Sequence, residues 1–188
     1  MYALILTRAQ RSQRGFTLIE TMVVVAIVAV LAALAAPSFT PIIERWRVHD
    51  ATESLQSALY LARSEAIKRG GNVVIRKELT GTNGCPLASG TSDWDCGWFV
   101  FVDANSNGTL NTGEEVLQRF AAPNNIQVTR SANGEFLRFD RWGRSGPFGF
   151  SIVPVDKSTS NPAARGLCMS SGGRIRVTSD SAEIPCND

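Results

Sequence analysis

The dominant feature of the hydrophobic pattern is an uncharged run over residues 21–43, bounded by Glu20 and Glu44. A helix over residues 16–36 would be about 31 Å long at ~1.5 Å per residue, close to the ~30 Å hydrocarbon core of a bilayer. Three arginines and no acid lie in the first 15 residues, so the positive-inside rule places the N-terminus in the cytoplasm. The pattern therefore predicts a membrane-spanning helix that leaves the rest of the chain on the outer side.

After this run the pattern becomes amphipathic over residues 37–71. Apolar residues recur on one helical face; these are Leu55, Ala58, Leu59, Ala62 and Ala66. Pro37 and Pro41 would kink or loosen the helix, because proline lacks an N–H group. The pair Gly70-Gly71 is a stop signal. We therefore expect one long helix over residues 16–69, whose second half packs on a folded head.

The head, residues 72–188, changes to the period of two that is typical of strands. Clusters of Gly, Asn, Ser and Pro separate eight candidate strands. These are Asn72–Lys77, Gly97–Val102, Glu115–Phe120, Ile126–Arg130, Phe136–Phe139, Phe148–Val153, Leu167–Ser170 and Gly173–Thr178. The pattern predicts an α+β fold in which a long N-terminal helix packs on a two-sheet antiparallel β head.

Four cysteines lie in a chain with an export-like N-terminus, which indicates an oxidising compartment. They allow three pairings. We favour Cys85 with Cys96 and Cys168 with Cys186, because each of these pairs closes a local loop. In the entropic description, a disulfide that closes a loop of about fifteen residues raises the free energy of unfolding by ~3 kcal/mol, which is enough to matter for a small head. There is no C-x-x-C motif, so redox and zinc-ribbon functions are poorly supported.

The carboxylate of Glu20 is unexpected at the mouth of an apolar run, because a charge costs ~2.5–3.5 kcal/mol at the centre of a spanning helix. Neither a plain anchor nor a secretory signal cut after Ala35 explains it. The stretch Arg14–Glu20, RGFTLIE, resembles the type III signal of type IV prepilins and type II secretion pseudopilins. That resemblance implies a leader over residues 1–15, cleavage between Gly15 and Phe16, N-methylation of Phe16, and a role for Glu20 in assembly. The new amine of Phe16 then supplies a cation for Glu20, in the same chain or a neighbour.

A second stretch, SLQSALYLARSEAIKRGGNVVI over residues 54–75, resembles the GspH/FimT branch of these proteins. The resemblance implies a non-catalytic minor pilin or pseudopilin with a pilin-like fold. Its implied partners are other pilins through the N-terminal helix, prepilin peptidase and the inner-membrane assembly platform. The implied location is the bacterial inner membrane with a single span and a periplasmic head, followed by a periplasmic or surface filament, where the subunit would prime or cap assembly.

The segment from Asp103 to Glu114 fits the EF-hand pattern D-x-[DN]-x-[DN]-G-x5-E. Its candidate calcium ligands are Asp103, Asn105, Asn107, Thr109 through its carbonyl, and Glu114. However, the segment joins two expected strands and has no entering helix. A β-hairpin loop rich in Asx turns is the simpler interpretation.

Charge is divided unequally along the head. Residues 80–118 carry five acids and no base, whereas residues 119–178 carry nine bases and three acids. Arg174 and Arg176 alternate on an expected strand, so both would point to one face beside Gly172-Gly173. Arginine is a strong bidentate phosphate ligand, and Gly173–Arg176 resembles the G-R-x-R tail of FimT-type pilins implicated in DNA uptake. A solvated strand face or a contact with a neighbouring subunit are the alternatives.

The sequence offers little for an enzyme. No phosphate-binding glycine loop, G-x-S-x-G or H-E-x-x-H motif is present, and His49 is the only histidine. We expect no cofactor. Three hypotheses remain: a structural subunit of a type II secretion pseudopilus, a minor subunit of a type IV pilus, and a DNA-binding pilin for natural transformation.

Overall fold

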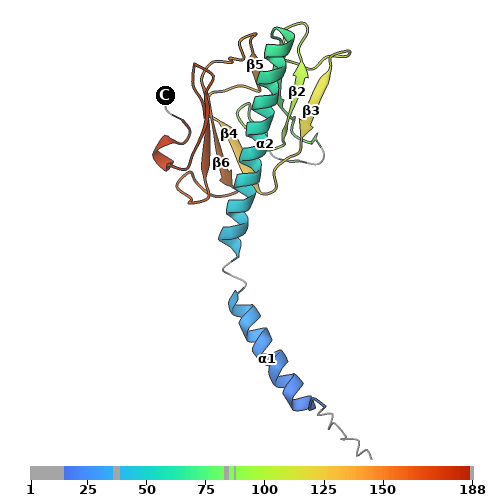
Figure 1. Cartoon of the computed structure of the whole chain (residues 1–188), viewed down its shortest axis with the longest axis vertical. Coiled ribbons are helices and arrows are strands. Elements are labelled where there is room, and N and C mark those ends of the chain that lie inside the picture. Colours follow the sequence, from blue (N-terminus) through green and yellow to red (C-terminus); the bar gives the residue numbers. More distant parts are fainter. Residues whose placement is uncertain (1–14, 36–38, 83–84, 87, 187–188) are drawn as a thin grey trace, which may run out of the picture. The chain divides into compact units, whose positions relative to one another are not determined.

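The computed structural model describes residues 15–35, 39–82, 85–86 and 88–186 (Figure 1). The chain forms two compact units, residues 1–40 and residues 41–188. In the first unit the described helix is α1, Leu18–Ala35. The second unit contains α2, Thr40–Arg69, which begins at the boundary, and all of the strands.

The prediction of one continuous helix over residues 16–69 is wrong. The structure has two helices, and Phe39 lies in a bend immediately before α2. Pro41 is in the first turn of α2, where a residue without an N–H costs nothing because that group has no partner inside the helix. Pro37 lies outside the described residues. Pro41 therefore marks the start of a second helix and not a kink within a single one.

The apolar face predicted for α2 is confirmed. Its buried residues are Val48, Ala51, Thr52, Leu55, Ala58, Leu59, Ala62 and Ala66. The helix ends at Arg69, and Gly70 and Gly71 both have positive φ, +80° and +114°. The N–H of Gly71 donates to the carbonyl of Ala66 at 2.8 Å, so the glycine pair closes the helix as expected from sequence.

The eight predicted strands are all present, with ends displaced by at most two residues. Two four-stranded antiparallel sheets form. The first, sheet A, has the order β3-β2-β1-β5, with β1 Val73–Lys77, β2 Trp98–Val102, β3 Val116–Phe120 and β5 Phe136–Phe139. The second, sheet B, has the order β4-β6-β7-β8, with β4 Ile126–Arg130, β6 Phe148–Pro154, β7 Arg165–Met169 and β8 Ile175–Thr178. The two-sheet antiparallel head is therefore confirmed.

One core holds α2 and both sheets together. Figure 1 shows α2 running along the two sheets, with β4 and β6 on one side and β2 and β3 on the other. Leu55 and Leu59 of α2, Ile75 and Trp98 of sheet A, and Phe150 of sheet B are fully buried in the same cluster. The alanines of α2 let the helix approach closely, because they add no bulk between it and the strands.

Each sheet also has its outer face covered by an irregular segment. On sheet A, Val74, Phe99 and Phe101 pack with Leu110 from the β2–β3 loop. On sheet B, Val153 and Ala164 pack with Ile184 from the C-terminal tail. The central strands β1, β2, β6 and β7 are consequently buried on both faces, which explains why WFVFV of β2 reads as a continuous apolar run rather than an alternating one.

Both favoured disulfides are confirmed. Cys85 is bonded to Cys96, and Cys168 is bonded to Cys186, each with a Cα–Cα distance of 5.6 Å. The second bond fastens the C-terminal tail to β7. The tail fits there because Gly149 and Gly166 lack side chains: a Cβ on Gly149 would lie 2.7 Å from Cys186 Cβ, and a Cβ on Gly166 would lie 3.0 Å from Ile184.

Candidate functional site

The residues predicted to be processed lie at the start of the first unit. Gly15 and Phe16 precede α1, and the Phe16 side chain is 80% exposed. The Thr17 hydroxyl accepts a hydrogen bond from the N–H of Glu20 at 3.3 Å, which satisfies one of the free donors at the helix N-terminus. Glu20 therefore lies in the first turn of α1, where the helix dipole favours an anion. The first 14 residues of the predicted basic leader, residues 1–15, lie outside the described residues.

The apolar side chains of α1 are exposed around the whole helix. Met22, Val23, Val24 and Val25 are consecutive, so they point in different directions, yet each is between 52% and 67% exposed. Glu20 is the only charged residue of this helix. A helix that is apolar on all sides is typical of an environment that excludes water, such as a membrane or the interior of an assembly.

Among the residues that the structure describes, no helix is both long and apolar enough to cross a membrane. The single span predicted over residues 16–36 thus stays a prediction.

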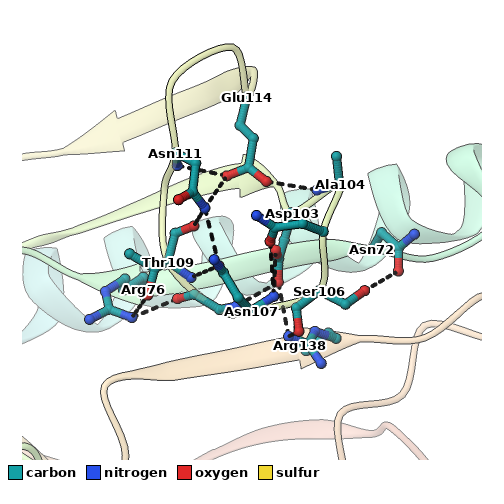
Figure 2. A network of polar contacts seen from close by, with 12 residues as sticks. Asn72, Arg76, Asp103, Ala104, Ser106, Asn107, Thr109, Asn111, Glu114 and Arg138 are labelled. Atoms are coloured by element: carbon teal, nitrogen blue, oxygen red, sulfur yellow. Dashed lines mark hydrogen bonds and ion pairs between the residues drawn. The ribbon is translucent and has the colours of Figure 1, made fainter.

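The EF-hand-like segment is a compact loop between β2 and β3, and Figure 2 shows its polar contacts. Asp103 is fully buried, and its carboxylate accepts the N–H groups of Asn107 at 3.0 Å and Gly108 at 2.8 Å. Arg138 of β5 donates to the same carboxylate at 2.9 Å and to the Ser106 carbonyl at 2.7 Å. The guanidinium of Arg138 thus supplies the positive charge that a buried carboxylate requires.

The other candidate calcium ligands are also engaged within the loop. The side-chain oxygens of Asn105 and Asn107 accept the N–H groups of Asn107 and Thr109, each two residues further on. Glu114 accepts from Ala104 at 2.9 Å and Asn111 at 2.8 Å. The bonds accepted by Asn105 and Asn107 are those of successive Asx turns. The described residues include no group of three or more acidic, histidine or cysteine side chains suited to a metal.

Of the two arginines predicted to contact DNA, only Arg176 lies within a strand. β8 begins at Ile175, so Arg174 precedes the strand and the expected alternation of both residues on one strand is wrong. The N–H of Arg174 instead donates to Ser170 Oγ, within a tight turn that contains Gly172-Gly173. Arg176 is in β8 and its guanidinium forms an ion pair with Glu183 at 2.6 Å.

His49 is placed on the exposed surface of α2, where it lies 3.2 Å from Glu53 one turn further on. Both side chains are about two-thirds exposed. A solvated histidine beside a carboxylate on one helix is an ordinary surface pair.

A turn that sequence analysis did not single out stands out in the structure. Residues 140–144, DRWGR, connect β5 towards β6 and lie against the end of α2. The carboxylate of Asp140 accepts the N–H groups of Trp142 at 2.8 Å and Arg144 at 2.9 Å. The N–H of Arg144, then that of Trp142, lower the pKa of this carboxyl. The signal in the sequence was an aspartate followed three residues later by glycine, which is common in turns.

Comparisons with known proteins agree with both halves of this architecture. A family model described as type II transport protein GspH matches residues 51–173, and a model of the prokaryotic N-terminal methylation motif matches residues 10–36. The pilin-like protein PilA1 of Thermus thermophilus is 31% identical to this chain over 175 residues, which cover 88% of this chain and 99% of that protein.

A solved structure of a minor pilin has a similar fold. The type IV minor pilin FimU of Pseudomonas aeruginosa has a TM-score of 0.54 and 22% identity, with 73% of this chain and 92% of that chain covered. The minor pseudopilin EpsH from the type 2 secretion system of Vibrio cholerae has a TM-score of 0.48 and 14% identity, with 70% and 96% covered. At these identities the likeness to FimU is evidence for the fold alone.

Proposed function

This chain belongs to the GspH family of pilin-like proteins, as a minor pilin or pseudopilin of a type IV pilus or type II secretion system, and we propose that it enters its filament as a non-catalytic subunit after cleavage between Gly15 and Phe16. One observation carries this proposal. The apolar side chains of α1 are exposed on every side, and Glu20 is the only charge among them. Such a surface needs to be covered by lipid before assembly and by the helices of other subunits after it.

The proposed role of Glu20 follows from its position in α1. Cleavage at Gly15 would create an amine on Phe16, one helical turn before Glu20. A carboxylate in apolar surroundings is stable only beside a cation or donor. The amine of a neighbouring subunit would therefore fix the register in which two such helices pack. In this proposal the membrane peptidase and the assembly platform act on the chain, and the head faces the periplasm.

The experiment compares processing with incorporation in cells that assemble the filament. Gly15→Val should block cleavage. Glu20→Ala should be cut normally, with methylated Phe16 seen by mass spectrometry, but should be reduced at least tenfold in the purified filament fraction. Glu44→Ala, which removes a half-buried carboxylate from α2, is the matched control and should be incorporated normally.

Two results would overturn the proposal. Wild-type chain that begins at Ala36 in the membrane-free fraction would indicate an ordinary signal peptide. Normal incorporation of Glu20→Ala would remove this carboxylate from the assembly mechanism. Recovery of the wild-type subunit at filament ends rather than along their length would support the priming or capping role.

DNA binding is a second candidate, supported by the exposed Arg174 in its glycine-rich turn. Arg176 is engaged by Glu183, so Arg174 is the arginine that a phosphate would contact first. A salt-dependent shift assay on the full chain in detergent, with Arg174→Gln and with Lys157→Gln as the control, tests it. A loss of binding specific to Arg174→Gln supports the candidate, and equal binding by both variants excludes it.

A further inference from the structure

The end of α2 leaves a pocket on the head. The pocket has a volume of about 290 Å³ and is lined by Gly70, Gly71, Asn72, Arg138, Phe139, Asp140 and Arg141. It exists because the helix closes with two glycines, whose positive φ values are rarely adopted by other residues. A Cβ on Gly70 would meet no atom within 4 Å, so no side chain fills the space at that position.

One wall of the pocket is the turn over residues 140–144. A Cβ placed on Gly71 would lie 3.4 Å from the backbone nitrogen of Arg141, so the turn lies directly against the helix end. On its other side, Gly143 faces α2: a Cβ there would lie 2.9 Å from Ile67. The bonds from Asp140 to Trp142 and Arg144 hold the turn in shape. The side chains on the turn are therefore presented from a rigid base.

Two of these side chains have no structural role within the part of the chain that the structure describes. Arg141 is exposed, and among the described residues its guanidinium has no hydrogen bond or ion pair. Trp142 is 67% exposed, although two other tryptophans of the head, Trp94 and Trp98, are fully buried. Ile67 of α2 adds a side chain that is 53% exposed. Arg144, by contrast, is held by Asp140 at 3.1 Å.

We propose that the surface formed by Ile67, Arg141, Trp142 and the adjoining pocket, called here the Trp142 patch, docks an acidic segment of another protein. An aspartate or glutamate of that segment would enter the pocket and accept hydrogen bonds from Arg141, while an apolar neighbour packs on Trp142 and Ile67. The inference goes beyond the proposed role of α1, because it concerns the head and not filament packing through the helix.

The composition of the patch decides between partners. Exposed tryptophan and arginine beside a concave, partly apolar pocket are the residues that dominate protein interfaces. Nucleic acid is held mainly by many phosphate contacts, each of which adds about one to the salt dependence of binding. The patch offers one unpartnered guanidinium, together with the carboxylate of Asp140. This charge is too small to hold a phosphate chain at physiological salt, but it suits a single carboxylate.

The proposal is tested on the full chain in a non-ionic detergent. The probe is a fluorescein-labelled peptide that alternates glutamate and phenylalanine, and binding is followed by anisotropy. Arg141→Gln and Trp142→Ala should each weaken binding about tenfold, as expected for central interface residues. A peptide with lysine in place of glutamate should not bind.

Two control variants test whether binding depends on the patch itself or on any exposed cation or tryptophan. Lys157→Gln removes an exposed cation from another loop, and Trp46→Ala removes an exposed tryptophan from α2. Both should bind the acidic peptide as wild type does. Thermal unfolding of all four variants checks that the head is intact; Trp142→Ala should unfold normally because its turn is held through backbone N–H groups.

Three outcomes would overturn the proposal. The first is acidic peptide binding that is absent, or is unchanged by Arg141→Gln and Trp142→Ala. The second is tighter binding of a single-stranded oligothymidylate that depends on the same two residues, which would assign the patch to nucleic acid. The third is self-association of the chain that is lost with these variants, which would make a second copy the occupant. None of these readouts depends on Glu20, so failure here is distinct from failure of the assembly proposal.

Discussion

At the scale of single residues, the described part of the head buries three charged side chains, Lys77, Asp95 and Asp103. Lys77 and Asp95 are satisfied by backbone groups of segments further along the chain, whereas Asp103 is satisfied by backbone N–H groups of its own loop and by the Arg138 side chain. The ammonium of Lys77 donates to the carbonyl of Ala88 at 3.0 Å, and Asp95 accepts the N–H of Val128 at 2.5 Å. These groups therefore fasten irregular segments to the sheets. Their hydrogen bonds are directional, whereas apolar packing is not, so they fix the position of each segment more closely.

Asp103→Ala should destabilise the head by about 2–4 kcal/mol, because it leaves Arg138 and two backbone donors without their acceptor. Chemical denaturation of the full chain in detergent measures the free energy of unfolding. Asn105→Ala, which removes one exposed acceptor from the same loop, should cost well under half as much. Equal costs for the two variants would show that the buried carboxylate has no special role.

Calcium should not stabilise the protein. The oxygens that an EF-hand would offer accept N–H groups, and the Arg138 guanidinium occupies the cationic position beside Asp103. Millimolar calcium, compared with excess chelator, should leave the unfolding temperature unchanged within error. A rise that saturates with calcium concentration would mean that the ion displaces these bonds.

Asp95 gives a prediction about pH. Burial, chiefly, and the nearby Asp93 raise the pKa of Asp95 above its ordinary value, although Lys77 and the Val128 N–H act in the opposite direction. Between that raised pKa and the ordinary value of about 3.9, the folded chain binds more protons than the unfolded chain, so acidification favours folding at this residue. Asp95→Asn retains an acceptor for Val128 but cannot take up this proton.

The free energy of unfolding of wild type relative to Asp95→Asn should therefore rise as the pH falls from 7 towards 4. Carboxyls whose pKa values are lowered, such as Glu65, Asp140 and Glu183, change the stability of both proteins equally and cancel in the comparison. Urea titrations at several pH values supply the measurement. A difference that stays constant or falls on acidification would contradict the prediction.

At the scale of elements, the C-terminal tail behaves as a cover for sheet B. Ile184 packs on Val153 and Ala164, and the disulfide from Cys186 to Cys168 joins the tail to β7. Gly149 and Gly166 provide the space beneath it. The tail is thus part of the head's packing, although it contains only a short 3-10 helix, Ser181–Glu183.

Replacing Cys168 and Cys186 by serine should lower the free energy of unfolding by about 3 kcal/mol, the value expected from the length of the loop that the bond closes. Limited proteolysis should then remove the tail while sheet A stays resistant. Gly166→Val, with the disulfide intact, should also expose the tail, because the new side chain would collide with Ile184. Protection of the tail in both variants would show that its covering role is incidental.

The elements were largely predictable because the local signals agreed with the final packing. The alanines and leucines of α2 repeat with the helical period, and the strand runs are short and bounded by turn residues. The break beside Pro41 was underestimated, since a proline in the first turn is also a signal for a new helix. Arg174 was wrongly assigned to a strand. An arginine in the turn just before β8 and an arginine within β8 give the same alternating pattern in the sequence.

At the scale of the whole molecule, every buried residue of the large core cluster lies between Val48 and Met169. The second unit, residues 41–188, should therefore fold without the first. Exported to an oxidising compartment, this fragment should be soluble and should unfold cooperatively at the same temperature as the full chain in detergent. A fragment that unfolds more than a few degrees lower would mean that α1 supports the head.

The parts of the candidate sites that sequence could not predict are those formed by distant segments. The EF-hand-like pattern lies in one stretch, but the ion partner that satisfies Asp103 is Arg138, on a different strand. The Trp142 patch joins the end of α2 to a turn about seventy residues later. Periodicity and turn signals are local, so they carry no information on which loops meet.

The covered outer faces of both sheets limit where the head of such a subunit can acquire new contacts. Because the β2–β3 loop lies over the centre of one sheet and the tail over part of the other, the central parts of both flat faces are covered. Contacts made by the head are left to its turns, its strand edges and the exposed side of α2. Substitutions in a five-residue turn such as 140–144 could therefore change the binding partner of the head during evolution, without altering the sheets beneath the turn.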